Sequence, residues 1–451
     1  MLEQLISEFQ NKKIVILGFG KEGKSTYKFL RKYLGNIHIT IKDQNEKIKN
    51  DELIKDDHNL TIITGPEYLE DLEEFDIIMK TPGITFKNIN IDKFKDKIYS
   101  QLEFILKYYR NNIIGITGTK GKSTTSSLMY NILQNNNVDS LLLGNIGNPI
   151  FDYLDNIHSD TILVIEMSSH QLEFINNSPK YAIITNFYQD HLDHTNGVED
   201  YYNSKLNITR FQNTQDYLLY YEGCETLDIH IQSNNITSNI LKVDFDNKQL
   251  PTYCTDDSIY VNGNKIYNTT DKRNLLGNHN LINIMLVLTL SNLLKLDNEK
   301  AIEAINSFIP LEHRLELVGT YNDITYYNDA IATIPEATIN GIKALEKVNT
   351  LIFGGLDRGI DYSYFIEYLN QSNIENLICM PTTGHVIANK LQQKETNKNI
   401  YIVDTLEEAV EIAKEVTKKE SICLMSPAAA SYEYYKNFEE KGTAYKQLIK
   451  K

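Results

Sequence analysis

The chain has 451 residues, which at about 150 residues per domain is enough for roughly three domains. Lys and Arg total 45 and Asp and Glu total 60, so the formal net charge is −15. A negative net charge is unfavourable for binding the negatively charged backbone of a nucleic acid. Apolar residues make up 41% and charged residues 23%, as in ordinary globular chains. We therefore expect a folded protein without a nucleic-acid partner.

The cysteines and the start of the chain favour a reducing, cytoplasmic setting. The four cysteines are scattered without a CxxC pair, so neither a disulfide framework nor a thiolate zinc site is predicted. Glu3 and Glu8 interrupt the basic and apolar start that a secretory signal needs. The most apolar segment, Leu281 to Leu296, is broken by polar residues and is too short for a bilayer span. We predict a buried helix there and no membrane insertion.

Short runs of β-branched residues alternate with helical stretches from end to end. Such runs, each followed by a turn, are typical of parallel strands buried on both faces. They occur at Ile14–Leu17, Thr61–Ile63, Asp76–Met79, Ile113–Ile116, Thr161–Ile165, Tyr181–Thr185, Thr350–Phe353, Ile400–Val403 and Ser421–Met425. Between them lie helices such as Leu406–Lys418. The predicted fold class is α/β.

Changes of pattern, rather than a linker, mark the domain boundaries. A first unit ends near Tyr99, and the strand at Ile113 opens a second unit with its own glycine loop. A polar region from Glu222 to Asp271, with a hairpin-like turn at Asn262-Gly263, interrupts the second unit. The break at Phe308–Pro310 introduces a third.

The strongest local motif is a loop rich in glycine and lysine between the strand at Ile113 and a helix. It reads Gly118-Thr-Lys-Gly-Lys-Ser-Thr124. Glycines let backbone N–H groups close around an anion, Lys122 adds a point charge, and the Ser123 hydroxyl suits Mg²⁺. Two residues separate Gly118 from Gly121, instead of the four in the common Walker pattern, so this is a distinct nucleotide loop. We predict that it binds phosphate.

A second glycine motif, Gly18-Phe-Gly-Lys-Glu-Gly23, directly follows the first strand, and Asp43 comes about twenty residues later. Alone, this pattern indicates a dinucleotide site, as in an NAD oxidoreductase, or only turn glycines. Because another phosphate loop follows it, we interpret the motif as a site for the diphosphate of a nucleotide-linked substrate.

Further polar residues follow the later strands. Glu166 ends a buried strand at the sheet edge where ligands bind, and a carboxylate opposite a phosphate loop commonly holds Mg²⁺. The segment Asp190–His194 is by itself either a metal pair or a polar loop. Lys205 alone is typical of a helical surface. The amides in Asn278–Asn283 either cap a helix or read a base edge.

Five motifs, in this order, resemble the Mur ligases, ATP-dependent amino-acid ligases of peptidoglycan synthesis. They are Gly118–Thr124, Glu166–Ser169, Asp190–Asp193, Gly277–Asn283 and His313–Glu316. The segment Met425–Gly442 is similar to the glutamate-adding branch of that family. The resemblance covers essentially the whole chain and implies three domains. These are a Rossmann-like UDP-substrate-binding domain (1–100), a central P-loop-type ATP-binding domain with a mostly parallel sheet (101–309) and a Rossmann-like amino-acid-binding domain (310–451).

The resemblance also implies a reaction. Glutamate, with the D-isomer favoured, is joined to UDP-N-acetylmuramoyl-L-alanine by a cytoplasmic, monomeric enzyme that forms ADP. The alanyl carboxylate attacks the γ-phosphate of ATP, and the glutamate amine then attacks the resulting acyl phosphate. Two Mg²⁺ ions are implied, held by Ser123, Glu166, His191 and a carbamylated Lys205. Carbamylation matters because an ammonium cannot ligate Mg²⁺, whereas its CO₂ adduct is an anionic oxygen ligand.

The remaining site residues are implied residue by residue. The catalytic residues are Lys122, His191 and Lys205. The ATP contacts are Gly118, Thr119, Lys120, Gly121, Lys122, Ser123, Thr124, Asn280, Asn283, Arg314 and Asp329. The UDP-linked substrate contacts Gly18, Lys21, Glu22, Gln44 and Asn145, and glutamate contacts Thr333, Arg358, Ser431 and Phe438.

The chain departs from the family pattern in two places. Ile331 stands where the glutamate ligases usually carry a lysine, so a cation beside ATP and glutamate is missing. Lys21-Glu22 and Gln44-Asn45 stand where UDP contacts are expected, without the usual basic residue after Asp43. The L-glutamate-adding type therefore stays open. So do an NAD-dependent oxidoreductase and a non-catalytic nucleotide-binding regulator, although neither gives Glu166 and His191 a use.

Overall fold

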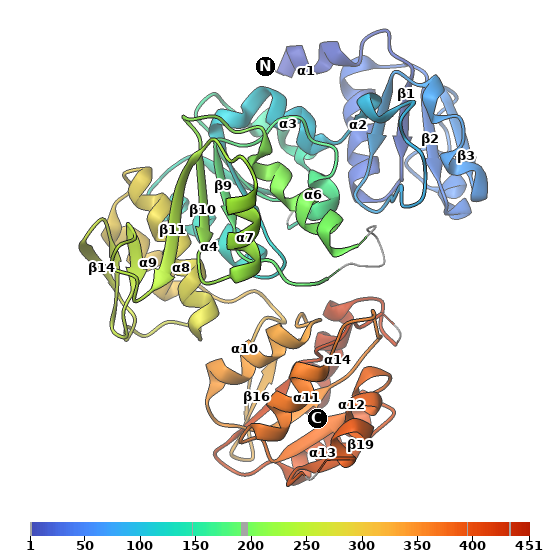
Figure 1. Ribbon diagram of the computed structural model, residues 1–451. Coiled ribbons are helices and arrows are strands. Elements are labelled where there is room, and N and C mark those ends of the chain that lie inside the picture. Colours follow the sequence, from blue (N-terminus) through green and yellow to red (C-terminus); the bar gives the residue numbers. More distant parts are fainter. Residues whose placement is uncertain (1, 147, 191–196, 395, 433) are drawn as a thin grey trace. The chain divides into compact units, whose positions relative to one another are not determined.

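The computed structural model describes residues 2–146, 148–190, 197–394, 396–432 and 434–451 (Figure 1). The chain folds into two compact units. The first comprises 1–188, 194–270 and 283–305, and the second comprises 189–193, 271–282 and 306–451. The strands of the described residues form sheets of five, nine and six strands, which confirms the predicted α/β class with three sheet-based domains.

The amino-terminal sheet is parallel throughout, in the order β3-β2-β1-β4-β5. Its strands are β1 (Ile14–Leu17), β2 (Ile39–Asp43), β3 (Leu60–Thr64), β4 (Ile77–Lys80) and β5 (Ile98–Tyr99), with helices α1 (Leu2–Glu8) and α2 (Lys21–Leu34). Alternate residues of β1 enter different cores: Ile14 and Ile16 pack in one cluster, Val15 and Leu17 in another. Both faces of the strand are therefore buried, which explains its unbroken apolar run.

The central sheet has the order β14-β13-β12-β11-β10-β9-β6-β8-β7 and is parallel from β7 to β12. The strands are β6 (Ile113–Thr117), β7 (Ser140–Gly144), β8 (Ile162–Glu166), β9 (Tyr181–Ile184), β10 (Tyr217–Tyr221), β11 (Asn239–Phe245), β12 (Thr252–Cys254), β13 (Ser258–Val261) and β14 (Asn264–Asn268). The helices of this region are α3 (Gln101–Tyr109), α4 (Lys122–Asn135), α5 (Ser169–Leu172), α6 (Val198–Arg210), α7 (Glu225–Ser233), α8 (Asn278–Leu293) and α9 (Asn298–Ser307).

The polar region from 222 to 271 extends this sheet, where we expected an interruption of the unit. Strands β13 and β14 pair antiparallel, and Asn262 and Gly263 between them have φ values of +50° and +77°. Two left-handed central residues make the tight hairpin turn that the Asn-Gly pair predicts.

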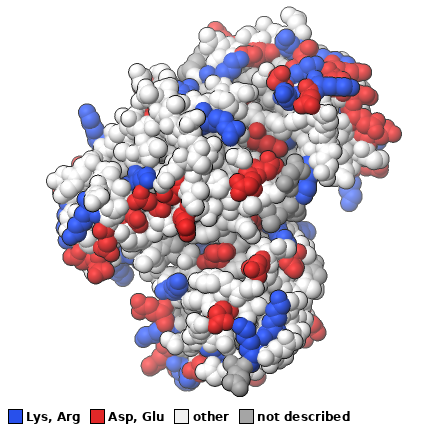
Figure 2. All heavy atoms as spheres, in the orientation of Figure 1, with Lys and Arg blue, Asp and Glu red and all other residues white. Residues whose placement is uncertain are grey.

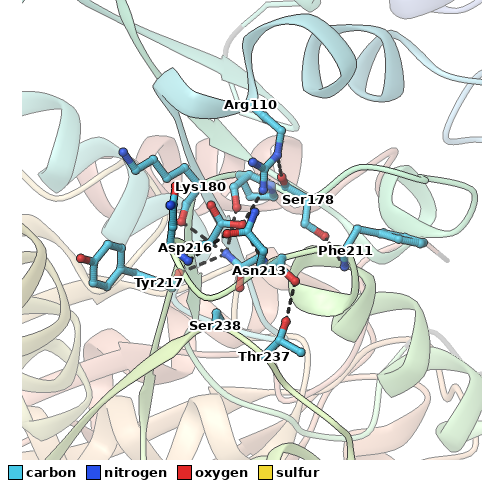
Figure 3. Close-up of polar contacts among 12 residues, drawn as sticks. Arg110, Ser178, Lys180, Phe211, Asn213, Asp216, Tyr217, Thr237 and Ser238 are labelled. Atoms are coloured by element: carbon cyan, nitrogen blue, oxygen red, sulfur yellow. Dashed lines mark hydrogen bonds and ion pairs between the residues drawn. The ribbon is translucent and has the colours of Figure 1, made fainter.

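Arg110 ties together the starts of three central strands (Figure 3). Its guanidinium donates to the Asp216 carboxylate at 2.6 Å and to the Ser178 carbonyl at 3.0 Å. Its own carbonyl accepts from the Lys180 N–H at 2.9 Å. Because β6, β9 and β10 run parallel, this cluster lies at the amino edge of the sheet, and the glycine loop after β6 lies at the opposite, carboxyl edge.

The third sheet has the order β15-β16-β20-β17-β18-β19, with only the β15–β16 pair antiparallel. Its strands are β15 (Glu316–Tyr321), β16 (Ile324–Asn328), β17 (Val348–Phe353), β18 (Asn376–Cys379), β19 (Asn399–Ile402) and β20 (Ile422–Met425). The helices are α10 (Pro335–Leu345), α11 (Ser363–Gln371), α12 (Thr383–Gln392), α13 (Leu406–Val416) and α14 (Phe438–Lys450). Leu351 and Ile352 of β17 enter different cores, so this sheet too is covered on both faces.

The apolar segment at Leu281 forms most of α8, and residues such as Ile284 and Leu288 are fully buried, which confirms the predicted core helix. No helix among the described residues is both long and apolar enough to cross a membrane. On the face shown in Figure 2, acidic and basic side chains are interspersed.

Candidate active site

The predicted phosphate loop lies between β6 and α4, and its shape depends on two glycines. Gly118 has φ +138°, and a Cβ there would lie 2.0 Å from the Thr185 hydroxyl oxygen. Gly121 has φ +88° and precedes the first residue of α4. The backbone N–H groups of Thr119 and Lys120 donate to the carbonyl and the side-chain oxygen of Asn186, each at 2.9 Å. The loop is thus fixed against the segment that follows β9.

Two lysines converge on one carbonyl of this loop. Lys122 Nζ donates to the carbonyls of Gly118 and Thr119, each at 2.9 Å. Lys205 Nζ, from α6, donates to the same Gly118 carbonyl at 2.9 Å and lies 4.4 Å from the centre of the Tyr201 ring. Lys205 is only 1% exposed, so the alternative of an ordinary surface lysine is wrong. A helical pattern alone gives no sign of this burial, because the covering loop comes from another part of the chain.

Glu166 ends β8 beside the phosphate loop, since Glu166 pairs with Ile116 of β6 in the strand register. The side chain is 1% exposed. Its Oε1 accepts from Asn145 Nδ2 at 2.6 Å, whereas Oε2 is buried without a hydrogen-bond partner in the described part of the chain. A buried carboxylate oxygen left unpaired is costly, so this geometry fits a cation ligand.

The structure describes only some of the other predicted metal ligands. Ser123 lies in the first turn of α4 and is 6% exposed. His191 lies outside the described residues. Among the residues that are described, no group of three or more His, Cys, Asp or Glu side chains forms a ready metal site. The predicted Mg²⁺ ligands do not form such a group, because they include the Ser123 hydroxyl and a carbamylated Lys205.

Asn283 joins α8 to the phosphate loop. Its Oδ1 accepts from the Thr125 hydroxyl at 3.1 Å, and a Cβ on Gly121 would lie 3.0 Å from that oxygen. Asn280, one turn earlier, donates to the Leu276 carbonyl at 2.8 Å. The neighbouring His279 is neutral at physiological pH, because burial lowers its pKa to about 4.

A cavity of about 650 Å³ lies in the first unit at the end of the amino-terminal sheet. The predicted residues Gly18, Lys21, Glu22, Gln44 and Asn145 all line it. Gly18 has φ +91°, and a Cβ there would lie 2.1 Å from the Thr81 hydroxyl oxygen. Sequence reasoning missed Thr81 to Ile84 and Gln171 in the wall. The Pro82-Gly83 pair, one residue after the end of β4, was the available signal.

Asp43 holds the glycine turn at the cavity's rim. Its carboxylate accepts from the backbone N–H of Phe19 at 2.6 Å and of Asn45 at 2.7 Å. A dinucleotide site would use this carboxylate for a ribose hydroxyl. Here both of its oxygens bind the protein's own backbone, so the motif shapes the turn.

Glu22 contributes a carboxyl group to the same cavity. Burial raises its pKa to about 7, although Lys80 and hydrogen bonds from Gln101 and Gln171 oppose the shift. Lys80 is itself 4% exposed and pairs with Glu173 at 3.3 Å. The cavity wall therefore contains a carboxyl group that titrates near neutral pH.

The second unit places the remaining predicted residues around β16, β20 and α14. The Asp329 carboxylate accepts from the Leu315 N–H at 3.1 Å and from the Ser426 hydroxyl at 2.8 Å. Arg314 follows His313, whose carbonyl accepts from the N–H of Ile331 at 3.2 Å. Thr333 lies half-buried in the same segment.

Three further residues of this unit were predicted to contact glutamate. The Arg358 guanidinium lies 5.2 Å from the centre of the Tyr432 ring. Phe438 begins α14 and lies 6.2 Å from the His313 ring. Ser431 is 5% exposed, and its hydroxyl oxygen is buried without a partner among the described residues.

Comparison with known proteins yields matches along most of the chain. Residues 12–100 match the Mur ligase MurD-like N-terminal domain, 116–291 the Mur ligase middle domain, and 313–429 the Mur ligase glutamate ligase domain. The chain is 33% identical to UDP-N-acetylmuramoylalanine--D-glutamate ligase of Oenococcus oeni, with 98% of each chain covered. It is also 33% identical to the ligase of that name from Clostridium kluyveri, over 97% of this chain and 96% of the relative.

Solved structures agree at the level of the fold. UDP-N-acetylmuramate-alanine ligase MurC of Thermotoga maritima aligns with a TM-score of 0.59 at 19% identity, covering 98% of this chain and 99% of that one. MurF ligase of the same organism, in complex with ADP, aligns with a TM-score of 0.60 at 15% identity, over 99% and 96%. With three domain matches in order and relatives above 30% identity along nearly its whole length, the chain belongs to the Mur ligase family.

Proposed function

We propose that this chain is an ADP-forming ligase that joins D-glutamate to UDP-N-acetylmuramoyl-L-alanine in the synthesis of peptidoglycan precursors. The observation that carries the proposal is the pairing of a glycine–lysine loop with the open carboxylate of Glu166 on the neighbouring strand. The activity of the relatives, UDP-N-acetylmuramoylalanine--D-glutamate ligases, suggests the substrates and the isomer. An oxidoreductase gives this pairing no use.

ATP fits the loop that follows β6. Lys122 and Lys205 donate to loop carbonyls, which are weaker acceptors than phosphate oxygens. Residues 118–124 would therefore hold the phosphates through Lys122 and the backbone N–H groups other than those of Thr119 and Lys120, which donate to Asn186. Asn280, Asn283, Arg314 and Asp329 would complete the ATP contacts.

Mg²⁺ fits the donors beside this loop. Glu166 Oε2 and the Ser123 hydroxyl would hold one ion, and His191 with a carbamylated Lys205 would hold a second. When bound, the ions neutralise the negative charge that gathers on the transferring phosphoryl group. The buried position of Lys205 suits the carbamate, because its remaining N–H can still donate to the Gly118 carbonyl.

The cavity at the end of the amino-terminal sheet fits the UDP-linked substrate. Gly18, Lys21, Glu22 and Gln44 would contact its nucleotide and diphosphate, and Asn145 would contact its muramoyl part. Asn145 also fixes Glu166, so one residue connects the substrate cavity to the proposed metal site. Thr333, Arg358, Ser431 and Phe438 would receive glutamate.

The proposed reaction has two steps. A carboxylate oxygen of the alanyl group attacks the γ-phosphorus, the bond to the β-phosphate oxygen breaks, and ADP leaves. The free amine of glutamate then attacks the acyl carbon, the amide bond forms, and inorganic phosphate leaves as the amine loses a proton. Both steps gather negative charge that Lys122 and the loop N–H groups stabilise.

The proposed arrangement of the whole chain follows the three matched domains. We place the boundaries at 1–100, 101–309 and 310–451, and propose a monomer that works in the cytoplasm without nucleic acid or membrane insertion. Light scattering of the purified protein measures the oligomeric state.

An ADP-release assay with omission controls tests the proposal. Continuous ADP release, beyond one equivalent per enzyme molecule, should occur only when ATP, Mg²⁺, the UDP-linked substrate and glutamate are all present. D-glutamate and L-glutamate are compared in parallel, and D-glutamate should give the higher kcat/KM. ADP release that needs neither glutamate isomer contradicts the proposal.

A further inference from the structure

Lys441 in α14 is a buried cation with no counter-ion among the described residues. It is 3% exposed, and its Nζ donates to the carbonyl of Gly354 at 2.9 Å. Burial lowers its pKa to about 8, and no acidic side chain of the described part of the chain moves it the other way. At pH 7 the side chain is still mostly charged. A buried charge that has only a neutral partner is costly, so it calls for an explanation.

Ser431 presents a second unsatisfied group at the same loop. Its hydroxyl oxygen has no partner within the described residues. The preceding residue, Ala430, accepts from the N–H of Leu356 at 2.8 Å, and Pro427 accepts from the N–H of Gly354 at 2.9 Å. The segments 427–431 and 354–356 therefore run side by side, with Ser431 at one end of the contact and Lys441 bonded to the other.

The loop between these two side chains is built from glycine. A Cβ on Gly354 would lie 2.2 Å from the Met380 carbonyl oxygen, and a Cβ on Gly355 would lie 2.3 Å from that of Ala430. The loop is therefore held tightly without side chains of its own at these positions. The Thr383 hydroxyl satisfies the Gly355 carbonyl at 2.6 Å, whereas Lys441 bonds to the Gly354 carbonyl and Ser431 follows the residue paired with Leu356.

We propose that Lys441, together with Ser431, binds a carboxylate of the incoming amino acid. An ammonium supplies the charge and a hydroxyl supplies a neutral donor, the combination that a carboxylate accepts. Lys441 has three N–H donors, so it can keep its bond to Gly354 while a second donor reaches the ligand. Phe438, one helical turn before Lys441, is already a proposed glutamate contact, which places both residues on one face of α14. This inference rests on the proposed function.

Steady-state kinetics of Lys441→Gln test the inference. The KM for glutamate should rise at least tenfold, whereas the KM values for ATP and the UDP-linked substrate should stay within about twofold, since only the amino acid loses an ionic partner. Lys441→Arg keeps the charge and should recover most of the loss. Lys450→Gln removes an exposed lysine of the same helix and should match the wild type.

Ser431→Ala covers the case in which Lys441→Gln does not fold. Because the Ser431 hydroxyl has no protein partner among the described residues, its removal should leave the thermal unfolding temperature unchanged while raising the KM for glutamate severalfold. An unchanged glutamate KM in a folded Lys441→Gln variant contradicts the role of Lys441 alone, whereas an unchanged KM in Ser431→Ala contradicts the placement of Ser431 in the glutamate site. A wild-type enzyme that releases ADP without needing glutamate contradicts the proposed function instead.

Discussion

Asn145 Nδ2 donates to Glu166 Oε1 at 2.6 Å, and this bond leaves Glu166 Oε2 as the open oxygen of a buried carboxylate. The amide therefore orients the carboxylate. We expect Asn145→Ala to raise the Mg²⁺ concentration for half-maximal activity about 10- to 100-fold, as loss of a partner of a metal ligand commonly does. Mg²⁺ titration of the ADP-release rate measures this, and an unchanged midpoint contradicts the role.

Lys122→Ala should lower kcat about 100- to 1,000-fold, because it removes a charge aimed at the transferring phosphoryl group. The fold should persist, since the bonds from Lys122 to the Gly118 and Thr119 carbonyls lie within its own loop. Circular dichroism checks the fold, and ADP release checks the rate. A folded variant with near wild-type turnover would show that the loop assignment is wrong.

Lys205→Ala should be nearly as severe as Lys122→Ala, because the carbamate that ligates Mg²⁺ cannot form. Added short carboxylates such as acetate should restore part of the activity, since their oxygens replace those of the carbamate. The wild-type enzyme in CO₂-depleted buffer supplies the comparison. Full wild-type activity there, together with a fully active variant, is incompatible with a carbamate.

Glu22 should make stability depend on pH. Its pKa is about 7 in the folded protein, against an ordinary value of 4.5. The folded state therefore binds the Glu22 proton more tightly than the unfolded state does. The contribution of this proton to the free energy of unfolding is complete below pH ~4.5 and is lost as pH rises through ~7. This pKa shift corresponds to a change of up to about 3 kcal/mol in the free energy of unfolding.

Glu22→Gln should remove that part of the pH dependence. Urea unfolding at pH 5 and pH 8 measures it in both proteins, and the difference between wild type and variant isolates Glu22 from the other buried carboxyls. If the free energy of unfolding changes equally with pH in the two proteins, the raised pKa of Glu22 is contradicted. The negatively charged substrate should also bind more weakly above pH 7 in the wild type only.

Asp216→Ala tests whether the amino edge of the central sheet contributes to stability and not to catalysis. Asp216 is 2% exposed and pairs with the partly exposed Arg110, so its loss should destabilise the fold by about 1.5–3 kcal/mol. The cluster lies at the edge away from the phosphate loop, so kcat per folded molecule should stay near the wild-type value. A selective loss of kcat without loss of stability would contradict this division.

Local patterns predicted the strands whose runs are fully apolar, such as β1 and β6, and the core helix α8. Strands with mixed sequences were missed, such as β2 (Ile39–Asp43) and β16 (Ile324–Asn328), because their residues acquire an apolar environment only after pairing. The glycine loop was visible since its residues are consecutive. The burial of Lys205, the bond from Asn145 to Glu166 and the buried position of Lys441 depend on contacts between distant segments, which no local pattern contains.

The central claim is ligation through an acyl phosphate, and transfer of oxygen isotope tests it most directly. The UDP-linked substrate is labelled with ¹⁸O in both oxygens of its alanyl carboxylate and is incubated with ATP, Mg²⁺ and glutamate. One labelled oxygen should appear in the inorganic phosphate by mass spectrometry, because that oxygen attacks the γ-phosphorus and leaves with it. Unlabelled phosphate, or label in AMP, would contradict the account.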